Sequence, residues 1–411
     1  MVNIKINFDF PDEWKRSHLD DFGNIVSGGT PSTAIPEYWN GHISWCTPTD
    51  ITRTEGTTIS RTEKTITDEG LKNSAAAILP AGSLLLCTRA TIGDLKINSI
   101  PMATNQGFKN IIPFKDTCVE YLYYLLQTKK KEMLEKATAS TFAEISKSAL
   151  CEIVLQKPQK KEQEKIAEVL SDTDVLIGNL KKLIIKKKNI HLGTMQMLIT
   201  GKKRLSGFRE EWIKINLSKN SRLKARIGWQ GLTTAEYLDD GYSYLITGTD
   251  FKDGQIDWNN CHYVNYDRYA QDPNIQISNG DLLLTKDGTI GKVAYVTGLK
   301  RPATLNSGVF LVKPITNAYT TRFMFYVLKS SVFKDFLQQQ LAGSTINHLY
   351  QKDLVKFELF VPPTKEEQDA IADILFDMDA EIHKLEEKLT KIQMIKWGMM
   401  EELLAGKIRL V

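Results

Sequence analysis

The sequence has few features of a membrane-spanning or secreted protein. No apolar run in its 411 residues reaches the about 18 residues that a transmembrane helix needs, and the amino-terminal stretch MVNIKINFDFPDEWKRS lacks the basic-then-apolar layout of a secretory signal. The cysteines Cys46, Cys87, Cys118, Cys151 and Cys261 are odd in number, far apart and never spaced C-x-x-C. We therefore expect a cytoplasmic protein with reduced, structural thiols and no membrane contact.

Common catalytic motifs are also absent. The stretches TGKK, AGKI and TIGK lack the earlier glycine and the Gly-Lys-Ser/Thr ending of a phosphate-binding loop. There is no Gly-x-Gly-x-x-Gly, no His-Glu-x-x-His and no Asn- or Asp-Pro-Pro-Tyr of an amino-methyltransferase, and the 6 histidines are dispersed without metal-ligand spacing. We predict no catalytic residue, no cofactor and no metal site, although an enzyme with an unrecognised site stays an alternative.

Composition permits two ordinary domains, because 42% of the 411 residues are hydrophobic. The formal charge of +4 is too small to indicate a polyanionic partner by itself. Nucleic-acid binders are recognised by where their basic groups lie, so the distribution of charge matters more than its sum.

The chain contains an internal repeat. A shift of 205 positions aligns residues 158–205 with 363–410 without a gap, and about 20 of the 48 pairs are identical. Weaker matches lie upstream: WCTPTDI (45–51) matches LITGTDF (245–251), GSLLLCTRATIG (82–93) matches GDLLLTKDGTIG (280–291), TNQG (104–107) matches LNSG (305–308) and ASTF (139–142) matches GSTI (343–346). A repeat of this length marks copied structural units. We predict globular domains at 1–157 and 206–362, each followed by a conserved segment, at 158–205 and 363–411.

The two conserved segments have the signals of long helices. Each begins with proline and an early Glu-Gln, contains no internal proline and has a glycine before its basic end. Apolar residues recur in steps of four and three from Ile166 to Ile184 and from Ile371 to Ile392, which is a coiled-coil pattern. The first segment has a net charge of +6 and the second of −4, so the two helices should attract each other. We expect an antiparallel pair, roughly 58 Å long at about 1.5 Å per residue, with the globular parts at opposite ends.

The two globular parts are predicted to be α/β domains with short strands. The internal repeat predicts that pseudo-twofold symmetry relates the two domains. SLLLCT, KVAYVT, GVFLVKP and KFELFVP are bounded by turn residues and predict strands, whereas 119–137 and 321–341 predict helices. The periodic aromatics in these helices, such as Tyr121 and Phe325, are interpreted as core residues and not as stacking platforms. The predicted fold class is therefore α/β (α+β), with two similar domains and an antiparallel coiled coil.

Small polar loops with an occasional basic residue recur in both halves. Arginine and lysine suit phosphate or guanine, asparagine and glutamine suit adenine, and threonine suits phosphate or a thymine methyl group. Turn formation also explains many of the glycine, threonine and aspartate residues in such loops. The candidate DNA-binding residues are Gly28, Gly29, Thr30, Thr47, Thr49, Thr88, Arg89, Thr91, Asn105, Gln106, Ser140 and Thr141 in the first half, and Lys224, Arg226, Trp229, Gln230, Thr247, Thr249, Lys286, Asp287, Thr289, Asn306, Ser307, Ser344 and Thr345 in the second.

The whole pattern resembles the specificity subunit of type I restriction-modification systems. The resemblance covers nearly the full chain and rests on the two W-x-x-x-x-L stretches at Trp14 and Trp212, on SGGTPSTAIPEYW, ITDEGLKNSAAAILPAGSLLL, TIG and TNQ, on Glu-Gln at both helix starts, and on LITGKKRL with LLAGKIRL. Each motif alone is modest, but their order and their repetition are specific to this family.

The resemblance implies a noncatalytic subunit whose two target recognition domains each read one half of a split, asymmetric sequence in double-stranded DNA. It further implies that the coiled coil sets the spacing and docks two methylation subunits, and that restriction subunits join through the complex. The two copies differ, since Gly93-Asp94 corresponds to Gly291-Lys292, so we expect two different half-sites. A two-headed adaptor that binds proteins and not DNA is the alternative.

Overall fold

The computed structural model describes residues 4–6, 13–137, 143–228, 231–341 and 348–410. The chain divides into two compact units. Unit 1 comprises Met1–Leu183 and Leu385–Val411, and unit 2 comprises Ile184–Lys384. Both long helices pass from one unit to the other, so each unit holds a segment of each.

Unit 1 contains a five-stranded sheet in the order β3-β10-β7-β8-β5, in which only β5 and β8 pair in parallel. A three-stranded sheet has the order β6-β4-β9, with β4 and β9 parallel. The strands are β3 Gly23–Ser27, β4 Trp39–Cys46, β5 Thr58–Ile59, β6 Lys64–Ile66, β7 Leu84–Cys87, β8 Leu95–Asn98, β9 Ala103–Thr104 and β10 Phe108–Pro113. The short helices α1 (Pro48–Arg53) and α2 (Asp68–Lys72) connect some of these strands, and α5 (Lys147–Cys151) follows them in the chain.

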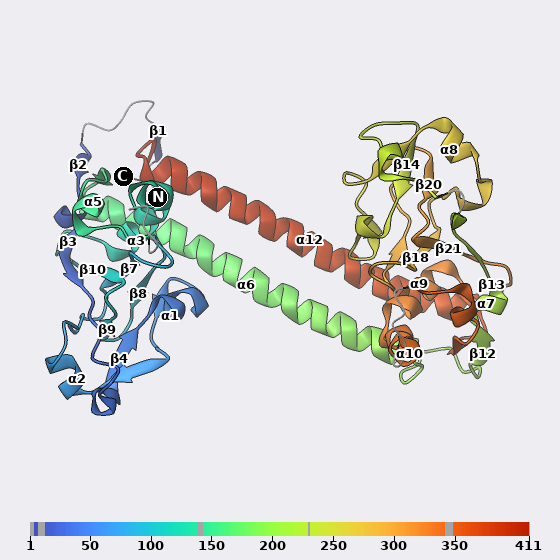
Figure 1. Ribbon diagram of the computed structural model, residues 1–411, viewed down its shortest axis with the longest axis horizontal. Helices are drawn as coiled ribbons and strands as arrows, with labels where there is room; N and C mark the ends of the chain where they lie inside the picture. The colour runs from blue at the N-terminus through green and yellow to red at the C-terminus, as the bar shows by residue number, and fades with distance from the viewer. Residues whose placement is uncertain (1–3, 7–12, 138–142, 229–230, 342–347, 411) are drawn as a thin grey trace. The chain divides into compact units, whose positions relative to one another are not determined.

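Two further strand pairs close unit 1 near the chain ends. β2 (Lys15–Ser17) pairs with β11 (Leu155–Lys157), and β1 (Ile4–Ile6) pairs with β23 (Ile408–Leu410), both antiparallel. Strands β1 and β23, from the two ends of the described chain, therefore lie side by side (Figure 1).

Unit 2 repeats this arrangement. Its larger sheet has the order β13-β21-β18-β19, and its three-stranded sheet has the order β17-β14-β20, again with one parallel pair, β14 with β20. The strands are β12 Ile213–Asn216, β13 Ser221–Lys224, β14 Ser243–Ile246, β15 Phe251–Lys252, β16 Gln255–Ile256, β17 His262–Val264, β18 Leu282–Thr285, β19 Val293–Tyr295, β20 Ala303–Leu305, β21 Val309–Pro314 and β22 Glu358–Val361, and the short helices are α7 Leu217–Asn220, α8 Tyr266–Ala270 and α11 Gln351–Leu354. The shared strand orders confirm the predicted duplication and the α/β class.

The predicted helices 119–137 and 321–341 are each two helices. In unit 1, α3 (Val119–Thr128) gives way to α4 (Lys130–Lys136) at Lys129, whose ψ is 2°. In unit 2, α9 (Thr321–Lys329) gives way to α10 (Ser331–Leu341) at Ser330, whose ψ is 173°. Ser330 accepts a hydrogen bond from the Val332 amide at 3.3 Å, which offers the backbone an alternative to continuing the helix.

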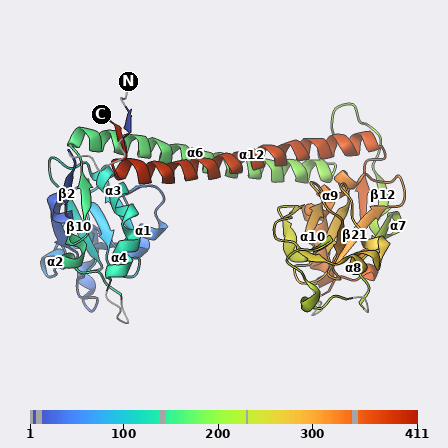
Figure 2. The same ribbon diagram turned by 90° about the horizontal axis from the view of Figure 1, so that it is seen from above.

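Aromatic residues of these helices are core residues, as predicted. Tyr121 and Tyr124 of α3 are 0% and 1% exposed, and Phe325 and Tyr326 of α9 are 7% and 1% exposed. Figure 2 shows α9 beside the segment of α12 that belongs to unit 2, where the Tyr326 hydroxyl donates to Asp379 at 2.9 Å.

The long helices are α6 (Lys160–Ile199) and α12 (Lys365–Leu404), each of 40 residues. All positions of the predicted coiled-coil pattern are buried or half-buried, and Ile166, Leu170 and Leu375 are fully buried. In unit 1, Lys396 pairs with Asp174 at 2.6 Å, and in unit 2, Lys187 pairs with Glu381 at 2.7 Å. Because early residues of α6 meet late residues of α12 and the reverse, the helices run antiparallel in both units.

The repeated Gly-Lys-x-Arg-Leu segment follows each long helix and brings its arginine to the other long helix. Gly201 and Gly406 have φ angles of 68° and 73°, a left-handed conformation that ends a helix and favours glycine. The arginine that follows then reaches the start of the other long helix. Arg204 donates two hydrogen bonds to Glu367, at 2.6 and 2.8 Å, and Arg409 donates two to Glu162 at the same distances.

Candidate nucleic-acid interface

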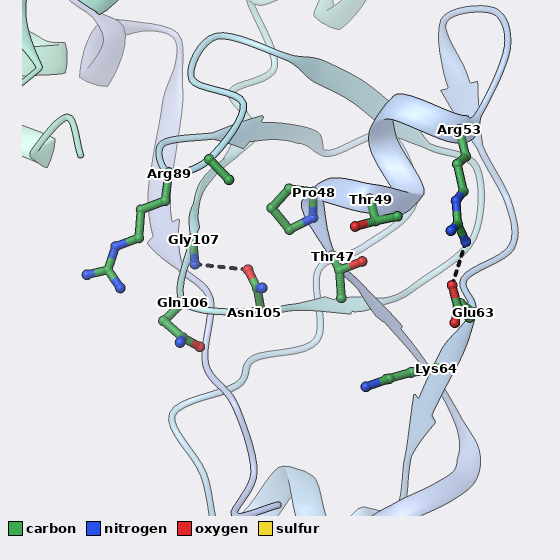
Figure 3. Close-up of a pocket in the computed structure, with 11 residues that line it drawn as sticks. Thr47, Pro48, Thr49, Arg53, Glu63, Lys64, Arg89, Asn105, Gln106 and Gly107 are labelled. Atoms are coloured by element: carbon green, nitrogen blue, oxygen red, sulfur yellow. Dashed lines mark hydrogen bonds and ion pairs between the residues drawn. The ribbon is translucent and has the colours of Figure 1, made fainter. Parts of the chain in front are cut away.

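A pocket of about 530 Å³ lies in unit 1 at the end of β4 (Figure 3). It brings together five of the candidate residues from segments far apart in the sequence. The lining residues are Thr47, Pro48, Thr49, Arg53, Glu63, Lys64, Arg89, Ala90, Asn105, Gln106 and Gly107. Sequence reasoning did not single out Arg53, Glu63 or Lys64, because isolated surface charges outside a motif carry no signal in one sequence.

Helix α1 places Thr47, Pro48 and Thr49 at this pocket. Asp50 caps the helix, since its Oδ2 accepts from the Thr47 amide at 2.8 Å and from the Thr47 hydroxyl at 2.6 Å. Its Oδ1 accepts from the Glu63 amide at 2.9 Å, which ties α1 to the start of β6. Asp50 is only 8% exposed and is therefore a structural residue that supports the pocket.

The charged groups of the pocket are predominantly basic. Arg53 pairs with Glu63 at 2.8 Å, and Arg89 pairs at 2.5 Å with Glu144, which lies just outside the lining. The Lys64 ammonium lies over the Trp39 ring, 5.8 Å from its centroid. Arg53 and Arg89 remain 71% and 45% exposed, so both guanidinium groups are accessible to an anionic partner. Exposed arginines of this kind suit phosphate oxygens and the acceptors of guanine.

The TNQG loop supplies Asn105, Gln106 and Gly107 to the pocket lining. Asn105 Oδ1 accepts from the Gly107 amide at 2.9 Å, a turn that fixes the direction of the Asn105 side chain (Figure 3). The Thr30 hydroxyl donates to Gln106 Oε1, which links this loop to the SGGTP stretch. Amide side chains held in this way suit hydrogen bonding to base edges.

Several predicted residues of unit 1 serve the packing of these loops. A Cβ at Gly28 would lie 1.8 Å from the Asn105 carbonyl oxygen, and one at Gly29 would lie 2.2 Å from the Ala75 carbonyl carbon, so both positions need glycine for close approach. Thr88 is fully buried and donates to the Gly107 carbonyl at 3.1 Å. Thr91 lies on the same hairpin, with a buried hydroxyl. These residues position the loops and do not form the pocket surface.

Unit 2 holds the equivalent loops in the same backbone frame. Asp250 accepts from the Thr247 amide at 2.7 Å and from its hydroxyl at 3.0 Å, as Asp50 does with Thr47. Burial raises the pKa of Asp250. The Asn306 amide donates to the Ile246 carbonyl at 2.9 Å, and the Asn105 amide donates to the Cys46 carbonyl at 3.0 Å. The LNSG loop therefore lies where the TNQG loop lies in unit 1.

The side chains on this frame differ from those of unit 1. Asn306 donates to the Tyr237 hydroxyl at 2.6 Å, and its Oδ1 accepts from the Ser307 amide at 2.5 Å. The Thr249 hydroxyl lies 2.6 Å from that of Thr247. The Lys286 ammonium lies 5.3 Å from the centroid of the Phe310 ring. Lys224, Asp287 and Thr289 are exposed or half-exposed.

The structure corrects the interpretation of Arg226 as a DNA contact. Arg226 is 2% exposed, and its guanidinium donates to the Leu305 carbonyl at 2.9 Å and to the Thr304 hydroxyl at 3.2 Å. Burial lowers the pKa of this arginine. Its donors are used inside the domain, so Arg226 supports β20 and is not presented to a partner. The candidates Ser140, Thr141, Trp229, Gln230, Ser344 and Thr345 lie outside the described residues.

The described residues contain neither a helix suited to spanning a membrane nor a cluster suited to binding a metal ion. None of its helices combines the length and apolarity needed to cross a membrane. Within the same residues, His, Cys, Asp and Glu side chains form no cluster suited to a metal ion. All five cysteines are free, and burial raises the pKa of Cys118 to about 11, so this thiol is not activated as a nucleophile.

Known proteins similar to this chain share its family. Residues 11–189 and 211–394 match the type I restriction modification DNA specificity domain. The chain is 44% identical to the MjaIX specificity subunit of Methanocaldococcus jannaschii over 174 residues. This alignment covers 42% of this chain and 40% of that protein. It is 24% identical to the MjaVIII specificity subunit of the same organism over 418 residues. This alignment covers 97% of this chain and 94% of that protein. It is 31% identical to the Escherichia coli EcoR124I/EcoR124II specificity subunit over 175 residues. This alignment covers 41% of this chain and 42% of that protein.

The first and last of these matches span well under half of the relatives' own length. Solved structures share the fold along nearly the full chain. The type I restriction-modification S subunit from M. genitalium aligns over 97% of this chain and 98% of its own, with a TM-score of 0.63 and 16% identity. A chain from a solved type I restriction-modification system aligns over 98% and 100%, with a TM-score of 0.58 and 13% identity. Together with the duplicated α/β units and the two packed long helices, these matches show that the chain belongs to the family of type I restriction-modification DNA specificity domains.

Proposed function

We propose that this chain recognises double-stranded DNA for a type I restriction-modification complex, and that each of its two domains reads one half of a bipartite, asymmetric target. The observation that carries the proposal is the basic pocket of unit 1, in which Arg53, Lys64 and Arg89 surround amide and hydroxyl groups. Cations of this kind hold phosphates, while amides and hydroxyls contact base edges. Unit 2 presents different side chains on the same backbone frame, which supports two different half-sites.

The long helices are proposed to set the spacing of the half-sites. Each has 40 residues, or roughly 60 Å at about 1.5 Å per residue, and each begins in one unit and ends in the other. Two weak readers on a stiff connection bind jointly only where the spacing of the half-sites matches that connection. The domain boundaries predicted from the sequence belong to this proposal: exchange of residues 206–362 for those of a relative should replace one half-site alone.

The same helices are proposed to dock two methylation subunits, with restriction subunits joining through that complex in the cytoplasm. Large apolar side chains on α6 and α12 support this, because several are exposed to solvent and exposed apolar side chains that gather on one surface mark sites of protein interaction. Met394 and Trp397 are 71% and 65% exposed, and Val175 and Ile185 are 58% and 61% exposed. Methyl transfer and DNA cleavage would then belong to the partners, and this chain would contribute no catalytic residue.

Salt dependence of DNA binding tests the proposal. A complex purified through a tag on this chain should bind a duplex with an affinity whose logarithm falls linearly with the logarithm of salt concentration, because phosphate contacts release counterions. Arg53→Gln should reduce that slope by about 1 if Arg53 contacts a phosphate. Lys15→Gln is the matched control, since Lys15 is an exposed cation on β2 outside the pocket lining.

An affinity that does not change with salt would favour the adaptor alternative over DNA recognition. Methyl transfer by the purified chain alone, assayed with DNA and a methyl donor, would refute the noncatalytic assignment.

A further inference from the structure

One pair of a basic and an acidic side chain occupies the same position in both units with the two partners exchanged, and the base of unit 2 is a histidine that carries charge only when it is protonated. In unit 1, Arg89 Nη2 lies 2.5 Å from Glu144 Oε2. In unit 2, the Asp287 carboxylate pairs with His348 Nδ1. The backbones of these residues also form equivalent isolated β-bridges, Arg89 with Glu144 and Asp287 with His348. The basic partner lies on the hairpin in unit 1 and on the returning segment in unit 2.

Backbone hydrogen bonds show that the two positions are equivalent. The Ile145 amide donates to the Thr88 carbonyl at 3.1 Å, and the Leu349 amide donates to the Lys286 carbonyl at 2.8 Å. The hairpins are joined to the polar loops in the same way, since the amide of Thr88 or Lys286 donates to the carbonyl of Gly107 or Gly308, at 2.7 and 2.9 Å. These bonds hold each pair in place whatever its charges are.

The side chains of Arg89 and Asp287 also leave the backbone in matching places. The Cβ of Arg89 lies 3.6 Å from the point where a Cβ at Gly107 would stand, and the Cβ of Asp287 lies 3.5 Å from that point at Gly308. The next residue is left-handed in both units, Ala90 with a φ of 60° and Gly288 with a φ of 67°. The two units therefore present opposite charges on one rigid frame.

Both pairs are partly exposed to solvent, although the Oδ1 atom of Asp287 is itself buried. The side chains of Arg89 and Glu144 are 45% and 30% exposed, and those of Asp287 and His348 are both 34% exposed. Ion pairs with this much solvent contribute little to stability. The charge at the position is thus free to serve recognition.

We propose that this ion pair sets a base preference in each half-site, an inference that rests on the proposed function. Arg89, which lines the pocket of unit 1, donates to the O6 and N7 acceptors of guanine, and Glu144 is a positioning residue that holds the guanidinium in one orientation. Asp287 accepts from the exocyclic amino group of cytosine or adenine, and His348 positions its carboxylate. The first half-site therefore contains a guanine at the position where the second contains cytosine or adenine, whose amino groups face the major groove.

Selection of bound duplexes from a randomised library tests this inference with the intact complex. Arg89→Asp combined with Glu144→His gives unit 1 the pair of unit 2. At one position of the first half-site, the preference should change from guanine to cytosine or adenine by about tenfold or more. The reciprocal variant, Asp287→Arg with His348→Glu, should introduce guanine at one position of the second half-site. Glu144→Gln alone should reduce discrimination at the guanine position while binding to unrelated DNA persists.

An exchange of Lys131 and Glu135, an exposed pair on α4 outside the pocket lining, is the matched control and should leave the motif unchanged. A wild-type complex that selects a split motif, together with exchange variants that select the same motif, would overturn this inference alone. A wild-type complex that selects no motif would overturn the proposed function as well. If one exchange variant fails to fold, the reciprocal variant decides the question in the other unit.

Discussion

Arg204 and Arg409 explain why one short segment occurs twice in the chain. Each lies just after a long helix, donates a pair of hydrogen bonds to the glutamate at the start of the other long helix, and places its guanidinium over a tryptophan ring, Trp212 or Trp14. In the sequence, Glu162 and Glu367 are recognisable only as the glutamates of the Glu-Gln pairs at the two helix starts. Their partners lie more than 150 residues away, so only the folded chain reveals these contacts.

Removal of Arg409 should be strongly destabilising. The side chains of Arg409 and Glu162 are 7% and 6% exposed, so Arg409→Ala leaves a buried carboxylate without its cationic partner, with only the Trp14 Nε1–H bond at 3.1 Å remaining. We expect the free energy of unfolding of unit 1 to fall by about 3 to 5 kcal/mol, measured by urea denaturation. Arg53→Ala, which breaks an exposed ion pair, should cost no more than about 1 kcal/mol. Equal losses in the two variants would contradict the role of Arg409.

His191 should make the stability of unit 2 sensitive to acid. It is 5% exposed, its Nε2 lies 3.4 Å from Asp379 Oδ1, and Lys329 and Tyr326 also face Asp379. Burial lowers the pKa of His191 below its usual 6.5. The folded state therefore binds fewer protons, and its stability should be fully present above about pH 6.5 and fall as the pH drops through the lowered pKa. Thermal unfolding of His191→Gln at several pH values should show a weaker dependence in this range, and an unchanged dependence would assign it to other groups.

At the scale of elements, glycine has opposite roles in the hairpins and in the long helices. Gly288 has a φ of 67° with open space around it, whereas Gly178 lies inside α6 with no atom near a Cβ. Gly288→Ala should lower the free energy of unfolding by about 1 kcal/mol, because the left-handed conformation is unfavourable for alanine. Gly178→Ala should raise it by about 0.5 to 1 kcal/mol, because glycine is a poor helix former. Chemical denaturation of both variants measures the two signs, and the same sign for both would refute the argument.

The sequence predicted elements well where periodicity and repetition were strong. The two long helices, their antiparallel direction and the four quoted strands were all visible in the sequence, because regular burial leaves a regular pattern. The breaks at Lys129 and Ser330 were missed, since neither residue is a strong helix breaker. Five of the eleven lining residues of the pocket were predicted from the loops, whereas Arg53, Glu63 and Lys64 were missed and Arg226 was assigned to the wrong environment. Burial of a single arginine depends on tertiary partners that leave no local pattern.

At the scale of the whole molecule, the proposed spacing role of α6 and α12 can be tested by changing their length. Insertion of one helical turn into both helices, at facing positions, should preserve both half-sites and change only the number of bases between them. Selection of bound duplexes from a randomised library measures half-sites and spacing together. Altered half-sites with the original spacing would contradict the role of the helices.

A map of modified bases in the host genome tests the central claim most directly. Cells that carry this chain with its partner subunits should show methylation at one split motif, with two different halves at a fixed separation, and deletion of the chain should abolish it. A continuous motif, or methylation that persists after the deletion, would contradict the claim that two domains of this chain read one bipartite DNA target.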